Sequence, residues 1–356
     1  MPLTYRLMLL VMLLVLAVNV VVYLALLGLV GWLGARLLAL DVSDSSDPLR
    51  ALAVRGLVLV LIGAVLFVLL RPLWVFLRRG RMPAVVVSSR DEPDLYAFVM
   101  TIAGLVGSPL PERIMVINDV NAAAGLESFF QGRLTLYLGL PLGALTCRQL
   151  AGVVAHELGH FSQRSGMRLT WVVRRLETLW PTLIADLDRS RQTGRPSLIV
   201  DTIIYRIPRV LFVTIHGLTR PLARAMDRQL ERHADLYEAR VAGSQAFMGT
   251  AVRLAELKYA ARETWSAVRA GQRTPQVARA VIQAHAAQTE AFRRAVVAEV
   301  SAGVTRWQDT HPSDIDRITY TAAEQAPGVY RCEAPARVLF RDFARLDQLA
   351  TSLVLR

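Results

Sequence analysis

The N-terminal part of the chain contains two long runs without charged residues. Leu7–Ala35 is uncharged over 29 positions, and about 20 apolar residues suffice to cross the hydrocarbon core of a bilayer. A second run, Gly56–Leu70, is uncharged over 15 positions and becomes long enough if Arg55 and Arg71 extend their guanidinium groups to the two interfaces. The pattern therefore predicts two transmembrane helices.

We expect these helices at about residues 7–35 and 52–77, within a membrane anchor that covers residues 1–80. The connector between them, Asp41–Asp47, is acidic, whereas the far end of the second helix is basic. Four arginines crowd that end: Arg71, Arg78, Arg79 and Arg81. Because positive flanks stay on the cytoplasmic side, we expect a multi-pass protein of a bacterial-type inner (plasma) membrane, with residues 81–356 in the cytoplasm.

A third apolar stretch, Leu198–Leu222, is interrupted by charged residues. They include Asp201, Arg206, Arg209 and Arg220. Each such charge costs about 2.5 kcal/mol or more at bilayer depth. We therefore expect an amphipathic helix that packs on the domain or lies in the headgroup layer, in preference to a third span.

Three short segments after residue 81 have the character of strands. Ala84–Val87 is β-branched, Arg113–Asn118 is a second candidate, and Arg133–Leu138 alternates strictly between apolar and polar positions. The leucines of the last segment share one face, and the other face carries Arg133, Thr135 and Tyr137. This alternation predicts a half-buried strand at the edge of a sheet.

Helical patterns dominate the rest of the chain. One helix is predicted from Asp91 to about Leu105, and another begins at the capping box Thr146–Gln149 and runs to about Gln163. Beyond residue 220 the pattern is almost wholly helical. Its breaks fall at Gly243, Gly271 and Pro312. The predicted fold class is α+β and mainly helical, with a small sheet.

Composition and charge narrow the function classes. Of 356 residues, 53% are hydrophobic and 20% are charged, with a formal net charge of +12. Cationic flanks of membrane spans account for part of this charge, and no aromatic-basic RNA motif or zinc-finger spacing appears, so we expect no nucleic-acid partner. The two cysteines, Cys147 and Cys332, lie 185 positions apart, too few and too distant for a disulfide framework or a thiolate zinc site. Any metal would then be held by histidine and carboxylate.

The helix after the capping box carries the sequence His156-Glu-Leu-Gly-His160. Helical spacing places the two imidazoles one turn apart on one face, where both can reach a single zinc ion. Glu157 lies beside them and can act as general base toward a zinc-activated water and then as acid toward a leaving amine. A surface helix with two incidental histidines is disfavoured, because the same face continues into apolar residues. The motif indicates metal-assisted hydrolysis.

A catalytic zinc needs a third protein ligand and an open position for water. The strongest candidate is Glu231, which lies in a later helical stretch. Asp235 follows one turn further on and can accept the outer ring N–H of a ligating histidine. From spacing alone, a solvated face on which both acids pair with neighbouring arginines remains open as an alternative.

Together these motifs resemble a known family. The combination comprises two N-terminal spans, Asn121-Ala122 in a strand, His156–His160, Glu231–Asp235 and Thr310–Arg317. In this order, over roughly residues 85–345, it resembles the membrane gluzincin metallopeptidases of the HtpX heat-shock protease and CAAX prenyl protease type. The resemblance implies a zincin-like domain, one Zn²⁺ ion per chain with Glu231 as its third ligand, and endopeptidase activity.

The resemblance also assigns residues around the reacting bond. It implies that His311 and Arg317 line the active site near the substrate carbonyl, where they would stabilise an oxyanion. A capping role for His311, which precedes Pro312 at a helix start, stays open. In this family the substrate adds in extended form to the strand before the helix, here Arg133–Leu138. The expected substrate edge comprises Asn121, Ala122, Arg133, Thr135 and Tyr137.

Two departures from the family pattern affect the interpretation. CAAX prenyl proteases form a chamber of many spans, whereas two are visible here, so HtpX-like quality control is favoured over prenyl-protein processing. Gln149 stands where the helix lead-in usually carries an acidic residue, which concerns capping and leaves the chemistry unchanged.

The sequence as a whole predicts a membrane-anchored zinc endopeptidase. Its expected partners are the lipid bilayer and polypeptide substrates, including misfolded membrane proteins. One alternative is a catalytically idle, zinc-stabilised membrane scaffold or adaptor. The intact Glu157 argues against it, because a purely structural site has no use for a base. A CAAX-type processing protease is the other alternative.

Overall fold

The computed structural model describes residues 3–39, 47–77, 83–126, 133–162, 164–194, 197–306, 309 and 312–355. These residues divide into two compact units. The first comprises Met1–Gly80 and Val172–Met226, and the second comprises Arg81–Trp171 and Asp227–Arg356. Each unit has its own apolar cluster.

The first unit is helical. Its elements are α1 (Leu3–Ala39), α2 (Pro48–Leu77), most of α5 (Arg164–Gly194), α6 (Leu198–Val200), the π-helical segment η2 (Asp201–Arg206) and the first part of α7 (Ile207–Ala242). Within the described residues, one helix segment, Leu49–Arg71 of α2, is long and apolar enough to cross a membrane by length and composition. Tyr23–Ala39 of α1 is apolar but shorter. The span predicted at residues 7–35 therefore stays a prediction.

The predicted membrane flanks are described only in part. Residues 41–46 of the acidic connector lie outside the described residues, as do Arg78, Arg79 and Arg81. The charge asymmetry from which the orientation was predicted is therefore a property of the sequence.

The interrupted apolar stretch after residue 197 is helical, and its acidic residue is paired. Asp201 is buried and accepts hydrogen bonds from Arg191 and Arg206, whose Nε atoms lie 2.5 Å and 2.7 Å from its two carboxylate oxygens. Apolar side chains of this stretch, α2 and α5 form one buried cluster: Val68, Leu179, Trp180, Leu183, Leu187, Phe212 and Ile215. Charged and apolar side chains thus segregate, as an amphipathic helix requires.

The second unit contains the sheet. Its elements are β1 (Val85–Val87), α3 (Pro93–Val106), β2 (Arg113–Ile117), β3 (Ala122–Leu126), β4 (Leu134–Gly139), η1 (Leu140–Ala144), α4 (Cys147–Gly159), α8 (Ser244–Arg269), α9 (Val277–Ala286), α10 (Glu290–Ala302), α11 (Asp314–Ala323), η3 (Ala336–Leu339) and α12 (Phe343–Val354). The strand order is β1-β2-β4-β3, with β2 and β4 parallel and the other neighbours antiparallel. The class is α+β and mainly helical, as predicted.

The strand predicted at Arg133–Leu138 forms as β4, but its predicted position at the sheet edge is wrong. β4 pairs with β2 on one side and β3 on the other, so the edge strands are β1 and β3. Both faces of β4 are also covered, and Thr135 is only 1% exposed. Side-chain alternation reports what covers the two faces of a strand, whereas lateral pairing uses backbone groups that every residue carries.

The residues predicted for the substrate edge therefore separate. Asn121 precedes β3, Ala122 begins it, Arg133 precedes β4, and Thr135 and Tyr137 lie within β4. Only the first two belong to the edge of the sheet.

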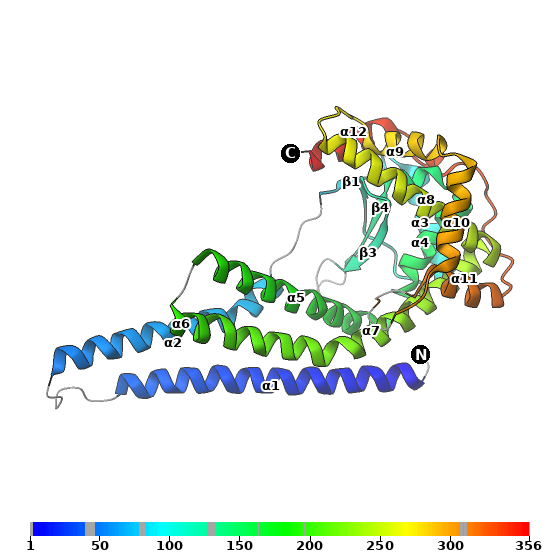
Figure 1. Cartoon of the computed structure of the whole chain (residues 1–356). Helices are drawn as coiled ribbons and strands as arrows, with labels where there is room; N and C mark the ends of the chain where they lie inside the picture. Colours follow the sequence, from blue (N-terminus) through cyan, green and yellow to red (C-terminus); the bar gives the residue numbers. More distant parts are fainter. Residues whose placement is uncertain are drawn as a thin grey trace. The chain divides into compact units, whose positions relative to one another are not determined.

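Helix α4 lies with α3 beside the sheet (Figure 1) and begins at the predicted capping box. The Thr146 hydroxyl accepts a hydrogen bond from the Gln149 backbone N–H, and the Gln149 side-chain oxygen accepts one from the Thr146 backbone N–H. The helix ends at Gly159, earlier than predicted, because the N–H groups of Phe161 and Ser162 bond to carbonyl oxygens three residues back and the chain forms a turn. A Cβ at Gly152 would lie 3.0 Å from Cβ of Ala242, so this glycine permits close packing of α4 on the end of α7.

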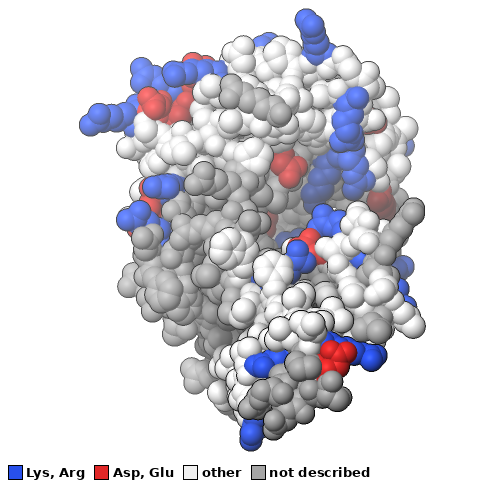
Figure 2. Space-filling view, turned by 90° about the vertical axis from the view of Figure 1, so that its left-hand side faces the viewer, with Lys and Arg blue, Asp and Glu red and all other residues white. Residues whose placement is uncertain are grey.

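Charged side chains are divided into small groups on the face shown in Figure 2. Arginine side chains gather at several places, with acidic side chains among them and uncharged surface between. On this face the positive charge of the chain is therefore distributed among separate groups.

Candidate metal centre

Two helices of the second unit bring three metal-ligand side chains together. α4 supplies His156, the C-cap residue of α4 is His160, and the part of α7 in this unit supplies Glu231. Nε2 of His156 lies 3.4 Å from Oε2 of Glu231, and Nε2 of His160 lies 3.5 Å from Oε1 of the same carboxylate. The structure thus brings together the three candidate ligands that the sequence and its resemblance predicted, and Glu231 does not lie on a solvated face, because its side chain is buried.

The spacing of these atoms fits a tetrahedral zinc ion. With Zn–N and Zn–O bonds of about 2.0–2.2 Å, two ligand atoms on such an ion lie about 3.3–3.5 Å apart. The distances of 3.4 Å and 3.5 Å fall in this range, whereas a direct N–H···O hydrogen bond is usually about 2.7–3.2 Å long. Two imidazoles and one carboxylate also leave a fourth position open, which is the donor set of a catalytic site.

Glu157 lies between the histidines and the edge strand. Its Oε2 accepts a hydrogen bond of 3.2 Å from the backbone N–H of Ala124 in β3. This N–H therefore points away from β4 and toward α4. The half-buried carboxylate is held at the place where the sheet edge meets the candidate ligands.

Asp235 lies on the opposite side of the His156 ring from Glu231. Its Oδ1 is 2.9 Å from Nδ1 of His156, and its side chain is 0% exposed. Burial alone would raise the pKa of Asp235, but hydrogen bonds from Arg317 and His156 outweigh burial and hold this pKa well below its usual value. The arrangement orients the ring so that Nε2 faces the other candidate ligands.

Arg317 contacts carboxylates on the Nδ1 side of His156. Its Nε and Nη2 donate to the two oxygens of Asp235 at 2.9 Å and 2.6 Å, and its Nη1 lies 3.6 Å from Asp314. With all three nitrogens beside carboxylates, Arg317 fixes Asp235 by a bidentate pair. The expectation that Arg317 lies near a substrate carbonyl stays a prediction. His311 lies outside the described residues.

Two further residues of the site were missed by sequence reasoning. Tyr320 on α11 donates its hydroxyl to Asp235. Glu238 on α7 places Oε2 3.7 Å from Nδ1 of His156, and burial raises its pKa to about 7. Glu231, Asp235 and Glu238 follow the helical spacing i, i+4 and i+7, which was the available signal for the third acid.

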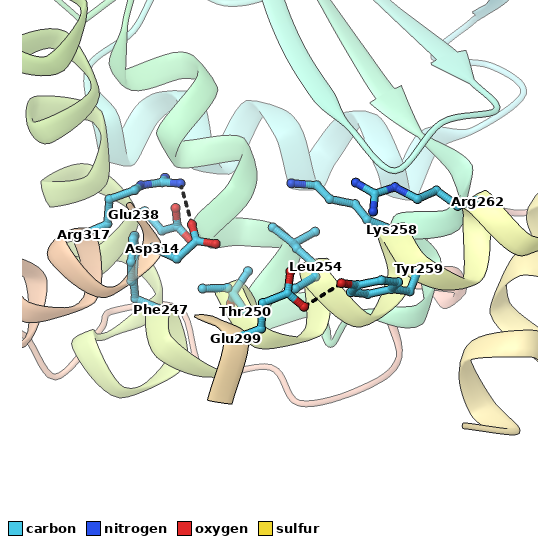
Figure 3. A pocket seen from close by; sticks show the side chains of 12 residues that line it. Glu238, Phe247, Thr250, Leu254, Lys258, Tyr259, Arg262, Glu299, Asp314 and Arg317 are labelled. Carbon is cyan, nitrogen blue, oxygen red and sulfur yellow. Dashed lines mark hydrogen bonds and ion pairs between the residues drawn. The ribbon is translucent and has the colours of Figure 1, made fainter. Parts of the chain in front are cut away.

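A pocket of about 180 Å³ adjoins Glu238 and Arg317. Glu238 and Arg317 lie at one end, and Lys258 and Arg262 of α8 lie at the other (Figure 3). In its wall Tyr259 donates a hydrogen bond of 2.5 Å to Glu299 of α10. Because Glu238 and Arg317 belong to the Nδ1 side of His156, this pocket lies behind that histidine and away from its Nε2.

A family model describes most of this unit. The model of Peptidase family M48 matches residues 89–324, which include α4, α7 and α11. The chain belongs to Peptidase family M48. The predicted resemblance to HtpX-type metallopeptidases is thereby confirmed.

Curated relatives of this M48 chain carry the description "Protease HtpX homolog". One from Pyrobaculum aerophilum is 22% identical over 219 residues, which are 59% of this chain and 60% of the relative. Another from Gemmatimonas aurantiaca is 24% identical over 242 residues, 66% of this chain and 77% of the relative. The chain thus spans about 60% of the length of the first of these relatives. No solved structure matches it.

Proposed function

We propose that this M48 chain is a membrane-anchored, zinc-dependent endopeptidase. The observation that carries the proposal is the convergence of two imidazole Nε2 atoms on one buried carboxylate, at 3.4 Å and 3.5 Å. In the proposal His156, His160 and Glu231 hold the ion. When bound, zinc would acidify a water molecule and polarise the substrate carbonyl.

Each of the neighbouring side chains has one task in this proposal. Glu157 accepts a proton on a carboxylate oxygen from the attacking water and later gives it to the leaving amine nitrogen. Asp235 holds the His156 ring through Nδ1, and Arg317 and Tyr320 hold Asp235. A proton acceptor beside a three-ligand site with an open position favours an enzyme over an idle zinc-stabilised scaffold.

The proposed substrate is an extended polypeptide that adds to β3. β3 is the edge strand beside the candidate ligands, and the N–H of Ala124 on its outer side already donates to Glu157, whereas the other edge strand is β1. A peptide paired along this edge would pass the candidate base and the candidate ligands with its backbone held by main-chain hydrogen bonds. Because such pairing reads backbone groups, it suits a broad range of polypeptides.

The proposed setting is a bacterial-type inner membrane. Leu49–Arg71 is apolar enough to span it, and the uncharged run over residues 7–35 supplies the second proposed span. The acidic connector and the arginines near residue 80 favour a cytoplasmic catalytic unit. At this membrane surface, misfolded membrane proteins are the proposed substrates, and prenyl-protein processing is the less favoured alternative.

The substitution Glu157→Gln tests the proposed chemistry. It removes the proton acceptor and keeps the three ligands, so zinc content should be unchanged while casein cleavage falls by several orders of magnitude. Both quantities are measured on the same purified full chain. Glu112→Gln is the matched control, because Glu112 is an exposed acid beside Arg133, and it should keep full activity. Normal cleavage by Glu157→Gln would rule out Glu157 as the base. Absence of cleavage by the zinc-loaded wild-type chain would instead favour the idle scaffold.

A further inference from the structure

The fold brings the two cysteines of the chain to one place. Cys147 is buried as the first residue of α4, and Cys332 is exposed in the segment that follows α11. Their separation of 185 positions gives no indication of this proximity, because the contact depends on the path of the chain around the second unit.

Backbone hydrogen bonds set an upper limit on the distance between the two residues. The N–H of Arg148 donates to the carbonyl oxygen of Cys332 at 2.7 Å, and the N–H of Cys147 donates to that of Ala334 at 2.8 Å. Standard geometry puts Cα of Cys147 about 2.4 Å from N of Arg148, and Cα of Cys332 about 2.4 Å from its own oxygen. The two Cα atoms are therefore at most about 7.5 Å apart, and disulfides occupy separations of about 4.4–6.8 Å.

The Cys332 thiol also acts on the thiol of Cys147. The pKa of Cys147 is raised to about 11, mainly by burial and further by the neighbouring Cys332 thiol. A buried thiol beside an exposed one gives an arrangement in which oxidant reaches Cys332 first and Cys147 is within reach of the product.

We propose that Cys147 and Cys332 form a reversible oxidative modification site, at which hydroperoxide-class oxidants generate an intramolecular disulfide. The Cys332 thiolate attacks hydrogen peroxide, its sulfur becomes a sulfenic acid, and the O–O bond breaks with release of hydroxide. The Cys147 sulfur then attacks the sulfenic sulfur, the S–S bond forms, and water leaves. Two thiols and one peroxide thus give one disulfide and two waters, and a small thiol reductant reverses the reaction.

The disulfide would fasten together the two helices that carry the candidate metal ligands. The segment before Cys332 is bonded to the end of α7, because the N–H groups of Val329 and Tyr330 both donate to the Val241 carbonyl. Cys147 opens α4, so a bond to Cys332 closes a loop that contains both helices. Cross-linking a loop of this length raises stability by restricting the unfolded chain. The chemistry is untouched, because His156 lies nine residues further on, about 13 Å along the helix.

Peptide mapping of the oxidised full chain tests the proposal. The purified protein is treated with hydrogen peroxide, alkylated and digested with trypsin. We expect the peptides Leu134–Arg148 and Cys332–Arg337 as one linked species, lighter by two hydrogens than their sum and separated by dithiothreitol. The linked species should form at least about tenfold faster in the folded chain than in urea, because the fold holds the thiols together. The melting temperature of the oxidised full chain should exceed that of the reduced chain by about 5–10 °C.

Cys332→Ser is the control, because Cys332 is exposed and its replacement leaves the buried thiol in place. This variant should give no linked species and no peroxide-dependent rise in melting temperature. Oxidation of Cys332 to a sulfinic acid while Cys147 stays alkylable, or linkage between two chains through Cys332, would overturn the proposal. A linked species without a rise in melting temperature would overturn the stabilising role.

Discussion

Replacing Arg317 by alanine removes the charged partner of a carboxylate that has no exposed surface. Asp235 accepts from Nε and Nη2 of Arg317 at 2.9 Å and 2.6 Å, and its remaining neighbours are the Tyr320 hydroxyl and Nδ1 of His156. Breaking a buried ion pair by removing one partner costs about 3–5 kcal/mol. The Arg317 side chain is 21% exposed, so water can enter its place. We therefore expect the free energy of unfolding to fall by an amount near the lower end of this range, about 3 kcal/mol.

The same substitution should weaken metal binding without removing a ligand. Without Arg317 the Asp235 carboxylate can tilt, and the His156 ring that it orients loses its fixed direction. Loss of such a supporting contact typically costs about 10–100-fold in metal affinity. Urea unfolding and zinc titration of the full chain in detergent measure the two effects separately.

Arg240→Ala provides the matched control on the same unit. Arg240 pairs with Glu324 at 2.5 Å, but its side chain is 60% exposed. Such a pair contributes about 1 kcal/mol or less, and the substitution should leave zinc affinity unchanged. If the free energy of unfolding of Arg317→Ala lies within about 0.5 kcal/mol of the wild-type value and the variant binds zinc equally well, the positioning role of Arg317 is wrong.

Two further predictions concern the sheet edge and the topology. A Cβ at Gly139 would lie 2.0 Å from the carbonyl oxygen of Asp119, so Gly139→Ala should lower the free energy of unfolding by about 3 kcal/mol or more. Gly125→Ala in β3, where a Cβ would meet nothing within 4 Å, should stay near wild type; equal stability of both variants would contradict the observed backbone approach. Residues 36–50 should face the periplasm or exterior with both termini cytoplasmic, so protease added to sealed spheroplasts should leave the catalytic unit whole. Degradation of the catalytic unit would contradict the predicted topology.

Local features of the fold were predictable because their causes are local. The capping box at Thr146 starts α4 through hydrogen bonds between residues three positions apart. The spacing of His156 and His160 places both on one helical face before any tertiary contact is known. The ligand role of Glu231 could not be predicted from local spacing alone, because Glu231 lies on another helix. Spacing left an arginine-paired face open, and the family resemblance favoured the ligand role.

Contacts between segments that are distant in the chain could not be predicted from the sequence. The alternation in β4 was read correctly as a strand, but its lateral neighbours pair through backbone groups and leave no side-chain pattern. The guanidinium of Arg317 binds Asp235, 82 positions away in the chain, a contact that the sequence does not indicate. The proximity of Cys147 and Cys332 was hidden for the same reason. Only the folded chain decides which of many possible partners a side chain meets.

Zinc titration of Glu231→Ala and Asp235→Ala tests the central claim most directly. Glu231→Ala leaves two imidazoles for the ion, so zinc should be largely lost at micromolar free metal, together with casein cleavage. Asp235→Ala removes a supporting contact, so zinc affinity should fall only by about 10–100-fold. The account predicts this graded pair of losses. Stoichiometric zinc of wild-type affinity in Glu231→Ala would contradict it and would mean that the third ligand lies elsewhere in the chain.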